Sequence, residues 1–198
     1  MRAHILRAVL LIALAGGVAG STSCTSAVRQ GEGSSYLIIQ SLVGVSGADD
    51  EETGTNLQSD VVTEGGVIED EGLVSFALGM KDVTSVTGPT TNNFITVTQY
   101  SVEFKRADGR NTPGVDVPYP FSGGLTLTVG DGAAQANFSL VRIQAKLEAP
   151  LLALRNLGGL GAISTVAEIT FYGHDQTGRA TSVKGQISVD FADYADPE

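Results

Sequence analysis

The residues that could carry out acid–base or nucleophilic chemistry are scarce. The 198 residues include 2 histidines, 1 cysteine and no tryptophan. His4 lies in the N-terminal leader described below, which leaves His174 as the only imidazole for a triad-type site. His174 stands beside Asp175 in a turn-like segment, where an aspartate already serves to cap the backbone. We therefore predict no catalytic residue.

Acidic residues are the other candidates. The formal net charge is -10, and the acids gather in two loop-like stretches, Gly47–Asn56 and Glu64–Gly72. Oxygen ligands suit calcium, but the run Asp49–Glu52 lacks the alternating spacing of an EF-hand loop. Zinc sites built from histidine and cysteine lack their ligands. We predict solvated loops with no metal and no cofactor, and leave calcium at these two loops open.

The N-terminus indicates export. Met1–Arg7 is positively charged, and Ala8–Gly20 is an apolar run of roughly a dozen residues, too short for a spanning helix of ~20 residues. Ser21–Cys24 follows and ends in the only cysteine. This segment resembles the lipobox of bacterial lipoproteins, although Ser21 stands where that family usually has leucine. The resemblance implies that Cys24 is acylated and becomes the mature N-terminus.

The lipoprotein resemblance sets the predicted organisation. Residues 1–23 are a signal peptide, 24–34 a flexible tether and 35–198 a single domain. Thr25, rather than aspartate, after the cysteine implies an outer-membrane destination. Two alternatives remain open: cleavage after Val18–Gly20 would give a secreted protein with a free thiol, and the cysteine could be accidental in a cytoplasmic one.

A hairpin near the C-terminus is the clearest structural signal. Apolar residues alternate with polar ones in both arms: Ala167, Ile169 and Phe171 in the first, and Val183, Ile187, Val189 and Phe191 in the second. Alternation of period two predicts strands with one apolar face. Asp175 and Gly178 between the arms predict the turn. A hairpin alone is marginal in water, so the rest of the domain must cover it.

Further strands are predicted in the remaining chain. They cover residues 35–45, 73–80, 94–105, 125–129 and 137–147. A short helix over 39–45 is the alternative for the first of them. In 73–80, Val74 and Phe76 are expected to face the core. A bulge near Thr98 would bring the two halves of 94–105 onto one face. Prolines make 111–121 a loop, with Tyr119 and Phe121 as a lid or an exposed pair. Pro150–Asn156 predicts a turn or two of helix.

The count and spacing of strands predict an all-β, antiparallel β-sandwich with at most one short connecting helix. Gln99–Gly109 and Ala167–Gly178 resemble strands of bacterial immunoglobulin-like or fibronectin type III-like modules. That resemblance implies an immunoglobulin-like sandwich, while a jelly roll or another Greek-key sandwich stays open. A single cysteine excludes an internal disulfide.

The composition favours a binding module over an enzyme. A strongly acidic domain is repelled by phosphate backbones, so nucleic acid is disfavoured as a partner. We predict a membrane-anchored, noncatalytic envelope protein that binds a protein or glycan. The alternative is a small hydrolase with two carboxylates, which would have to converge within ~5 to 10 Å. The aromatic content of 6% without tryptophan counts against sugar binding by such an enzyme.

Overall fold

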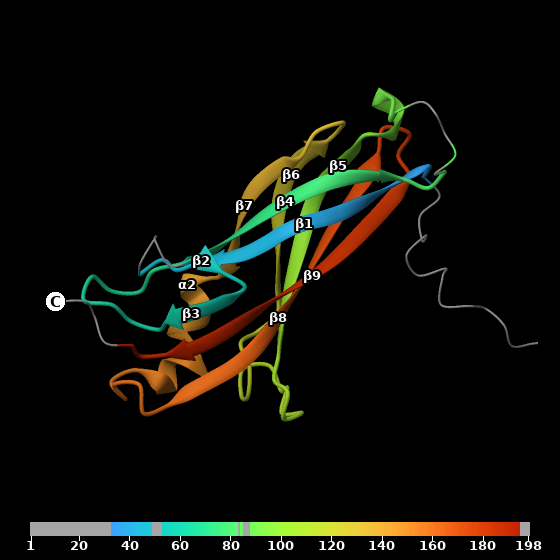
Figure 1. The fold of residues 1–198 in the computed structure, drawn as a ribbon. Coiled ribbons are helices and arrows are strands. Elements are labelled where there is room, and N and C mark those ends of the chain that lie inside the picture. Colours follow the sequence, from blue (N-terminus) through green and yellow to red (C-terminus); the bar gives the residue numbers. More distant parts are fainter. Residues whose placement is uncertain (1–32, 49–52, 83, 85–87, 195–198) are drawn as a thin grey trace, which may run out of the picture. The chain divides into compact units, whose positions relative to one another are not determined.

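Two β-sheets form the domain in the computed structural model, which describes residues 33–48, 53–82, 84 and 88–194. The strands are β1 (Ser35–Val45), β2 (Thr53–Gly54), β3 (Asn56–Asp60), β4 (Asp70–Met80), β5 (Ile95–Lys105), β6 (Phe121–Val129), β7 (Ala134–Val141), β8 (Ala162–Asp175) and β9 (Ala180–Ala192). The helices are short: η1 (Thr91–Asn93) and η2 (Leu151–Leu154) are 3-10 turns, and α2 (Ile143–Leu147) is α-helical. Figure 1 shows the two layers of strands.

The strand order is that of an immunoglobulin-like sandwich. One sheet has the order β2-β1-β4-β7 and the other β3-β9-β8-β5-β6. In the lettering used for immunoglobulin domains, the first sheet contains strands A, B and E, which are β1, β4 and β7. The second sheet contains C′, C, F and G, which are β6, β5, β8 and β9. All pairs are antiparallel except β3, which runs parallel to β9. The predicted all-β sandwich, with one short α-helix among the described residues, is confirmed.

The predicted hairpin supplies the centre of the second sheet. β8 and β9 pair from Ala162↔Ala192 to His174↔Ala180. Gly178 has φ of 85°, a backbone conformation that glycine adopts without steric cost. The three apolar residues of the first arm, Ala167, Ile169 and Phe171, are fully buried.

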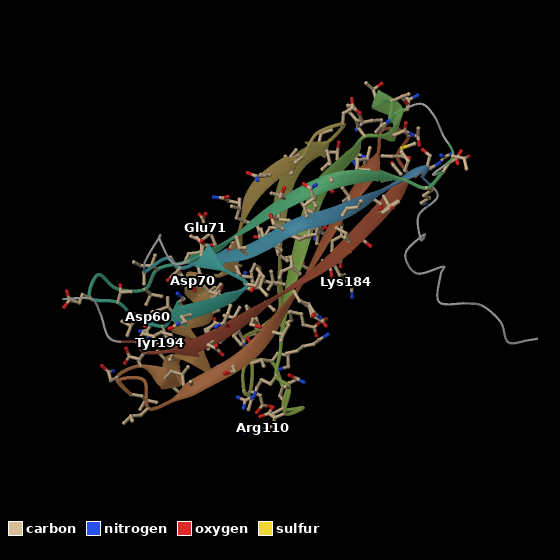
Figure 2. The ribbon with its side chains drawn as sticks, viewed as in Figure 1. Asp60, Asp70, Glu71, Arg110, Lys184 and Tyr194 are labelled. Carbon is tan, nitrogen blue, oxygen red and sulfur yellow. The ribbon has the colours of Figure 1, made fainter. Side chains whose placement is uncertain are left out.

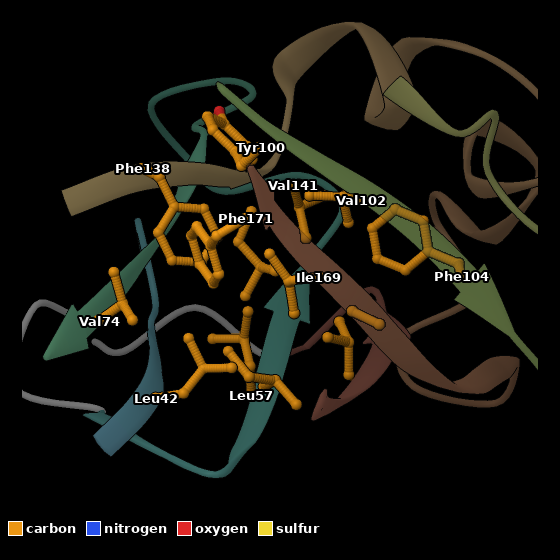
Figure 3. Close-up of a cluster of buried hydrophobic side chains, with 14 of the residues drawn as sticks. Leu42, Leu57, Val74, Tyr100, Val102, Phe104, Phe138, Val141, Ile169 and Phe171 are labelled. Atoms are coloured by element: carbon orange, nitrogen blue, oxygen red, sulfur yellow. The ribbon is translucent and has the colours of Figure 1, made fainter. Parts of the chain in front are cut away.

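Aromatic rings from both sheets meet in the core (Figure 3). Phe171 of β8 makes edge contacts with Phe76 of β4 and Phe138 of β7, at centroid distances of 5.0 and 5.3 Å. Tyr100 of β5 packs on Phe138 at 5.1 Å. These contacts join the two layers, because β4 and β7 belong to one sheet and β5 and β8 to the other.

The bulge in β5 lies where the sequence predicted it. The register of β5 shifts between Val97 and Gln99 against both of its neighbours, β6 and β8. Ile95 and Val97 before the shift and Val102 and Phe104 after it are all buried. One extra residue therefore returns the second half of the strand to the core face.

Residues 35–45 form a strand, and the alternative of a short helix over 39–45 was wrong. β1 pairs with β4 along its length, with a register shift between Ile39 and Ser41.

Phe121, predicted to end a loop, begins β6 instead, and Arg142 lies 4.0 Å above its ring. Tyr119 remains in the preceding loop and is 52% exposed, so the two aromatics do not form one lid.

One predicted strand was wrong in its second half. The strand predicted over 137–147 ends at Val141, and α2 begins at Ile143. Leu140 and Val141 are both buried, so alternation stops where the chain turns across the end of the sandwich. α2 buries Ala145 and Lys146, and η2 buries Leu151 and Leu154. The two helices close this end of the core, which a continued strand could not do.

Candidate functional site

The residues singled out by sequence fall in different places. Cys24, the leader and the acidic run Asp49–Glu52 lie outside the described residues. His174 is exposed at the end of β8, and its Nδ1 lies 3.1 Å from the carbonyl oxygen of Asp175. Within the described part of the chain, no group of three or more His, Cys, Asp or Glu side chains is arranged to hold a metal ion.

Asp175 caps the hairpin turn and does not orient His174. Its Oδ1 accepts hydrogen bonds from the backbone N–H groups of Thr177 and Arg179, at 2.9 and 3.0 Å, and from the Thr177 hydroxyl at 2.7 Å. These donors, the Thr177 hydroxyl foremost, lower the pKa of Asp175. The carboxylate is thus committed to the turn.

Replacing Asp175 with asparagine is expected to flatten the acid limb of the stability profile. A carboxylate whose pKa is lowered by folding adds stability above its unfolded pKa of about 4, and that stability disappears as the pH falls. Asparagine keeps the acceptor oxygen but cannot titrate. Urea unfolding measured from pH 7 to pH 2 checks this. Parallel profiles for both proteins would contradict it.

Two carboxylates do come together, on the outer face of the second sheet. Glu103 and Glu168 are cross-strand partners on β5 and β8. The Nζ of Lys105 lies 2.5 Å from Glu168 and 3.4 Å from Glu103. The hydrogen bond from Lys105 lowers the pKa of Glu168, whereas a general acid needs a raised pKa. This arrangement is suited to a surface ion pair.

A second charged cluster is buried, and the sequence did not reveal it. Asp70, expected in a solvated loop, is the first residue of β4 and is fully buried. Its Oδ2 lies 2.9 Å from Nζ of Lys146 and accepts a hydrogen bond of 2.5 Å from the Ser59 hydroxyl. Its Oδ1 accepts one of 3.0 Å from the backbone N–H of Gly47.

The Asp70 cluster ties four elements together near one end of the domain (Figure 2). Gly47 follows β1, Ser59 lies on β3, Asp70 begins β4 and Lys146 lies on α2. Arg155 adds a hydrogen bond of 3.1 Å from its Nη2 to the carbonyl oxygen of Lys146. The available signal was Lys146 itself, a lone cation between apolar residues. Its partner, 76 positions earlier, could not be read from spacing.

Five aliphatic side chains are exposed within residues 143–160, the segment that contains Lys146. We name this set the leucine surface: Ile143, Leu147, Leu152, Leu157 and Leu160, which are 43, 48, 46, 41 and 95% exposed. The first two lie four residues apart on α2, Leu152 is on η2, and the last two follow η2. Positive φ at Gly158 and Gly159 forms a turn before Leu160, whose backbone N–H donates to the carbonyl oxygen of Leu157 at 3.0 Å.

The leucine surface and the entry point of the chain lie at opposite ends of β8. Gly33, just before β1, packs beside Asp175 at one end of β8, because a Cβ on Gly33 would lie 3.0 Å from Asp175 Oδ2. Leu160 immediately precedes Ala162 at the other end. Thirteen steps of a strand at ~3.3 Å per residue separate the two ends of β8 by about 40 Å.

Comparison with protein-family models, with curated proteins and with solved structures finds no match. Among the described helices, none has the length and apolar character that crossing a membrane requires.

Proposed function

We propose that the chain is a noncatalytic binding module, held at a bacterial envelope membrane by a lipid on Cys24, and that the leucine surface contacts a protein partner. The observation that carries this proposal is the exposure of five aliphatic side chains within one segment of 18 residues. Apolar patches of this kind on soluble domains mark interaction sites.

The chemistry of the leucine surface favours a protein over a glycan. Its members are aliphatic, and sugar rings are usually held by aromatic faces. The position of the leucine surface favours a protein partner over the membrane that would hold the lipid. The chain enters the domain at Gly33, about 40 Å away at the opposite end of β8.

The charges near the leucine surface are of both signs. From Ala133 to Ser164 the chain carries Arg142, Lys146 and Arg155 against Glu148. Asp70 neutralises Lys146, and the backbone of Asp193 lies beside Gly159. A border of mixed charge suits a protein partner whose apolar patch is surrounded by polar and charged side chains.

Substituting Leu160 with aspartate is expected to weaken partner binding about tenfold or more, because an apolar anchor is replaced by a charge. A photo-crosslinking residue at Leu152 in intact cells reports the contact, and the adduct should vanish with Leu160→Asp. The same probe at Tyr172, on the far sheet face, serves as the control. An adduct that survives Leu160→Asp, or that consists of lipid or of a second copy, would refute the proposal.

Cys24→Ala is expected to release the protein from the membrane fraction. A diacylglyceryl group with an amide-linked chain anchors far more strongly than one chain, and the described domain offers no spanning helix to replace it. Cell fractionation with detection of the full chain measures this. A substituted protein that stays with the membrane would show that the lipid on Cys24 is not the anchor.

A further inference from the structure

We propose that Lys146 and Asp70 become joined by an intramolecular amide bond between Nζ and Cγ. The pair has the three features that such a bond needs. The reacting groups touch, at 2.9 Å between Nζ and Oδ2. Their side chains are 2% and 0% exposed, so bulk water is kept away. Hydrogen-bond donors are placed on both carboxyl oxygens.

Burial makes the charged form of the pair costly. Two ions removed from water lose several kcal/mol of hydration each, and their attraction offsets this only in part. The reaction requires one proton to move from Nζ to Oδ2, and these two atoms lie 2.9 Å apart. This transfer frees the Nζ lone pair for attack on Cγ.

The step balances without any other reactant. The Nζ lone pair attacks Cγ, and a tetrahedral intermediate forms with its negative charge on Oδ1. Oδ2 departs as water after taking a proton, the C–N bond remains, and the nitrogen loses one proton. The products are one secondary amide and one water molecule. Neither carbon nor nitrogen changes oxidation state.

The neighbouring donors lie where this reaction needs them. The backbone N–H of Gly47 donates to Oδ1, the oxygen that would carry negative charge and later become the amide carbonyl. The Ser59 hydroxyl donates to Oδ2, the oxygen that would leave, at 2.5 Å. Fixed contact between nucleophile and carbonyl replaces a bimolecular encounter, which contributes much of the rate of intramolecular reactions.

The amide would attach α2 covalently to β4. α2 carries two members of the leucine surface, Ile143 and Leu147. A covalent link would hold this end of the sandwich closed when a load acts between the two ends of the domain. The inference stands on the Asp70 cluster and does not depend on the proposed function.

Tryptic mapping of the full purified chain, denatured after folding, tests the amide. Trypsin does not cleave after an acylated lysine, so the amide yields Gln30–Lys81 joined to Ile143–Arg155, with a mass one water below their sum. Without the amide, cleavage after Lys146 yields separate linear peptides, which would overturn the proposal. The exposed pair Lys105 and Glu168, also in contact, is the internal control and should remain unlinked.

Two variants separate the chemistry from folding. Lys146→Arg keeps a cation beside Asp70 but should give only linear peptides, and a branched peptide in this variant would place the link elsewhere. Ser59→Ala should slow formation of the branched peptide about tenfold or more after refolding, as loss of a proton donor does. An unchanged rate would overturn the role given to Ser59.

Discussion

Replacing Lys146 with methionine is expected to lower the free energy of unfolding by about 3–5 kcal/mol. Methionine fills the space of the stem but leaves the Asp70 carboxylate buried without a cation. Asp70 keeps hydrogen bonds from Ser59 and Gly47, which do not replace the charge of Nζ. The variant also loses the proposed amide link, which adds to the effect. Urea unfolding at pH 7 gives the value.

Two further variants identify the cause of this loss. Adding Asp70→Asn to Lys146→Met should restore part of the stability, because a neutral amide is less costly to bury than an unpaired carboxylate. Lys105→Met removes a lysine from an exposed ion pair and should change stability little, since water solvates Glu168 in its place. Equal losses from Lys105→Met and Lys146→Met would show that burial of the charge is not the reason.

The sequence predicted the parts of the fold that depend on neighbours along the chain. The alternation in the terminal hairpin, the turn glycine Gly178 and the bulge near Thr98 are all local signals, and each was confirmed. In each case the side chains that decide the backbone conformation lie within a few residues of one another. Period-two alternation identifies the strands and the bulge, and the Asp and Gly residues identify the turn.

The sequence failed where the deciding contact is distant. The change from β7 to α2 occurs because the chain has reached the end of the sheet and must cover the core there, and a local apolar run cannot show that limit. Asp70 was misplaced for a related reason. An acid in an acidic stretch is ordinarily solvated, and only the approach of Lys146 explains its burial.

The candidate interaction surface was missed as well. The sequence predicted a strand as far as residue 147 and a turn or two of helix over Pro150–Asn156, without saying which leucines face outward. In the structure Leu151 and Leu154 are buried. A segment that closes the end of a sandwich has one side against the core and one side outward. The leucines on its outer side are therefore exposed. Positive φ at Asn156 and Gly158 affects only the residues that follow, Leu157 and Leu160.

Phe171→Ala is the substitution expected to test the packing between the two layers most directly. Phe171 is fully buried on β8 and contacts the rings of Phe76 and Phe138 from the opposite sheet, at 5.0 and 5.3 Å. Truncation removes these contacts and leaves a cavity that close-packed neighbours cannot fill. The expected cost is about 3–5 kcal/mol of unfolding free energy.

Tyr172→Ala is the matched control, because Tyr172 is the next residue on the same strand and points to the other face. It is 42% exposed, and its hydroxyl lies 3.3 Å from the Ser101 hydroxyl. Its loss should cost under about 1 kcal/mol, as is usual for surface positions. Chemical denaturation of both variants measures the contrast. Similar losses at the two positions would mean that β8 does not separate a core face from a solvent face, which would contradict the packing of two sheets around Phe171.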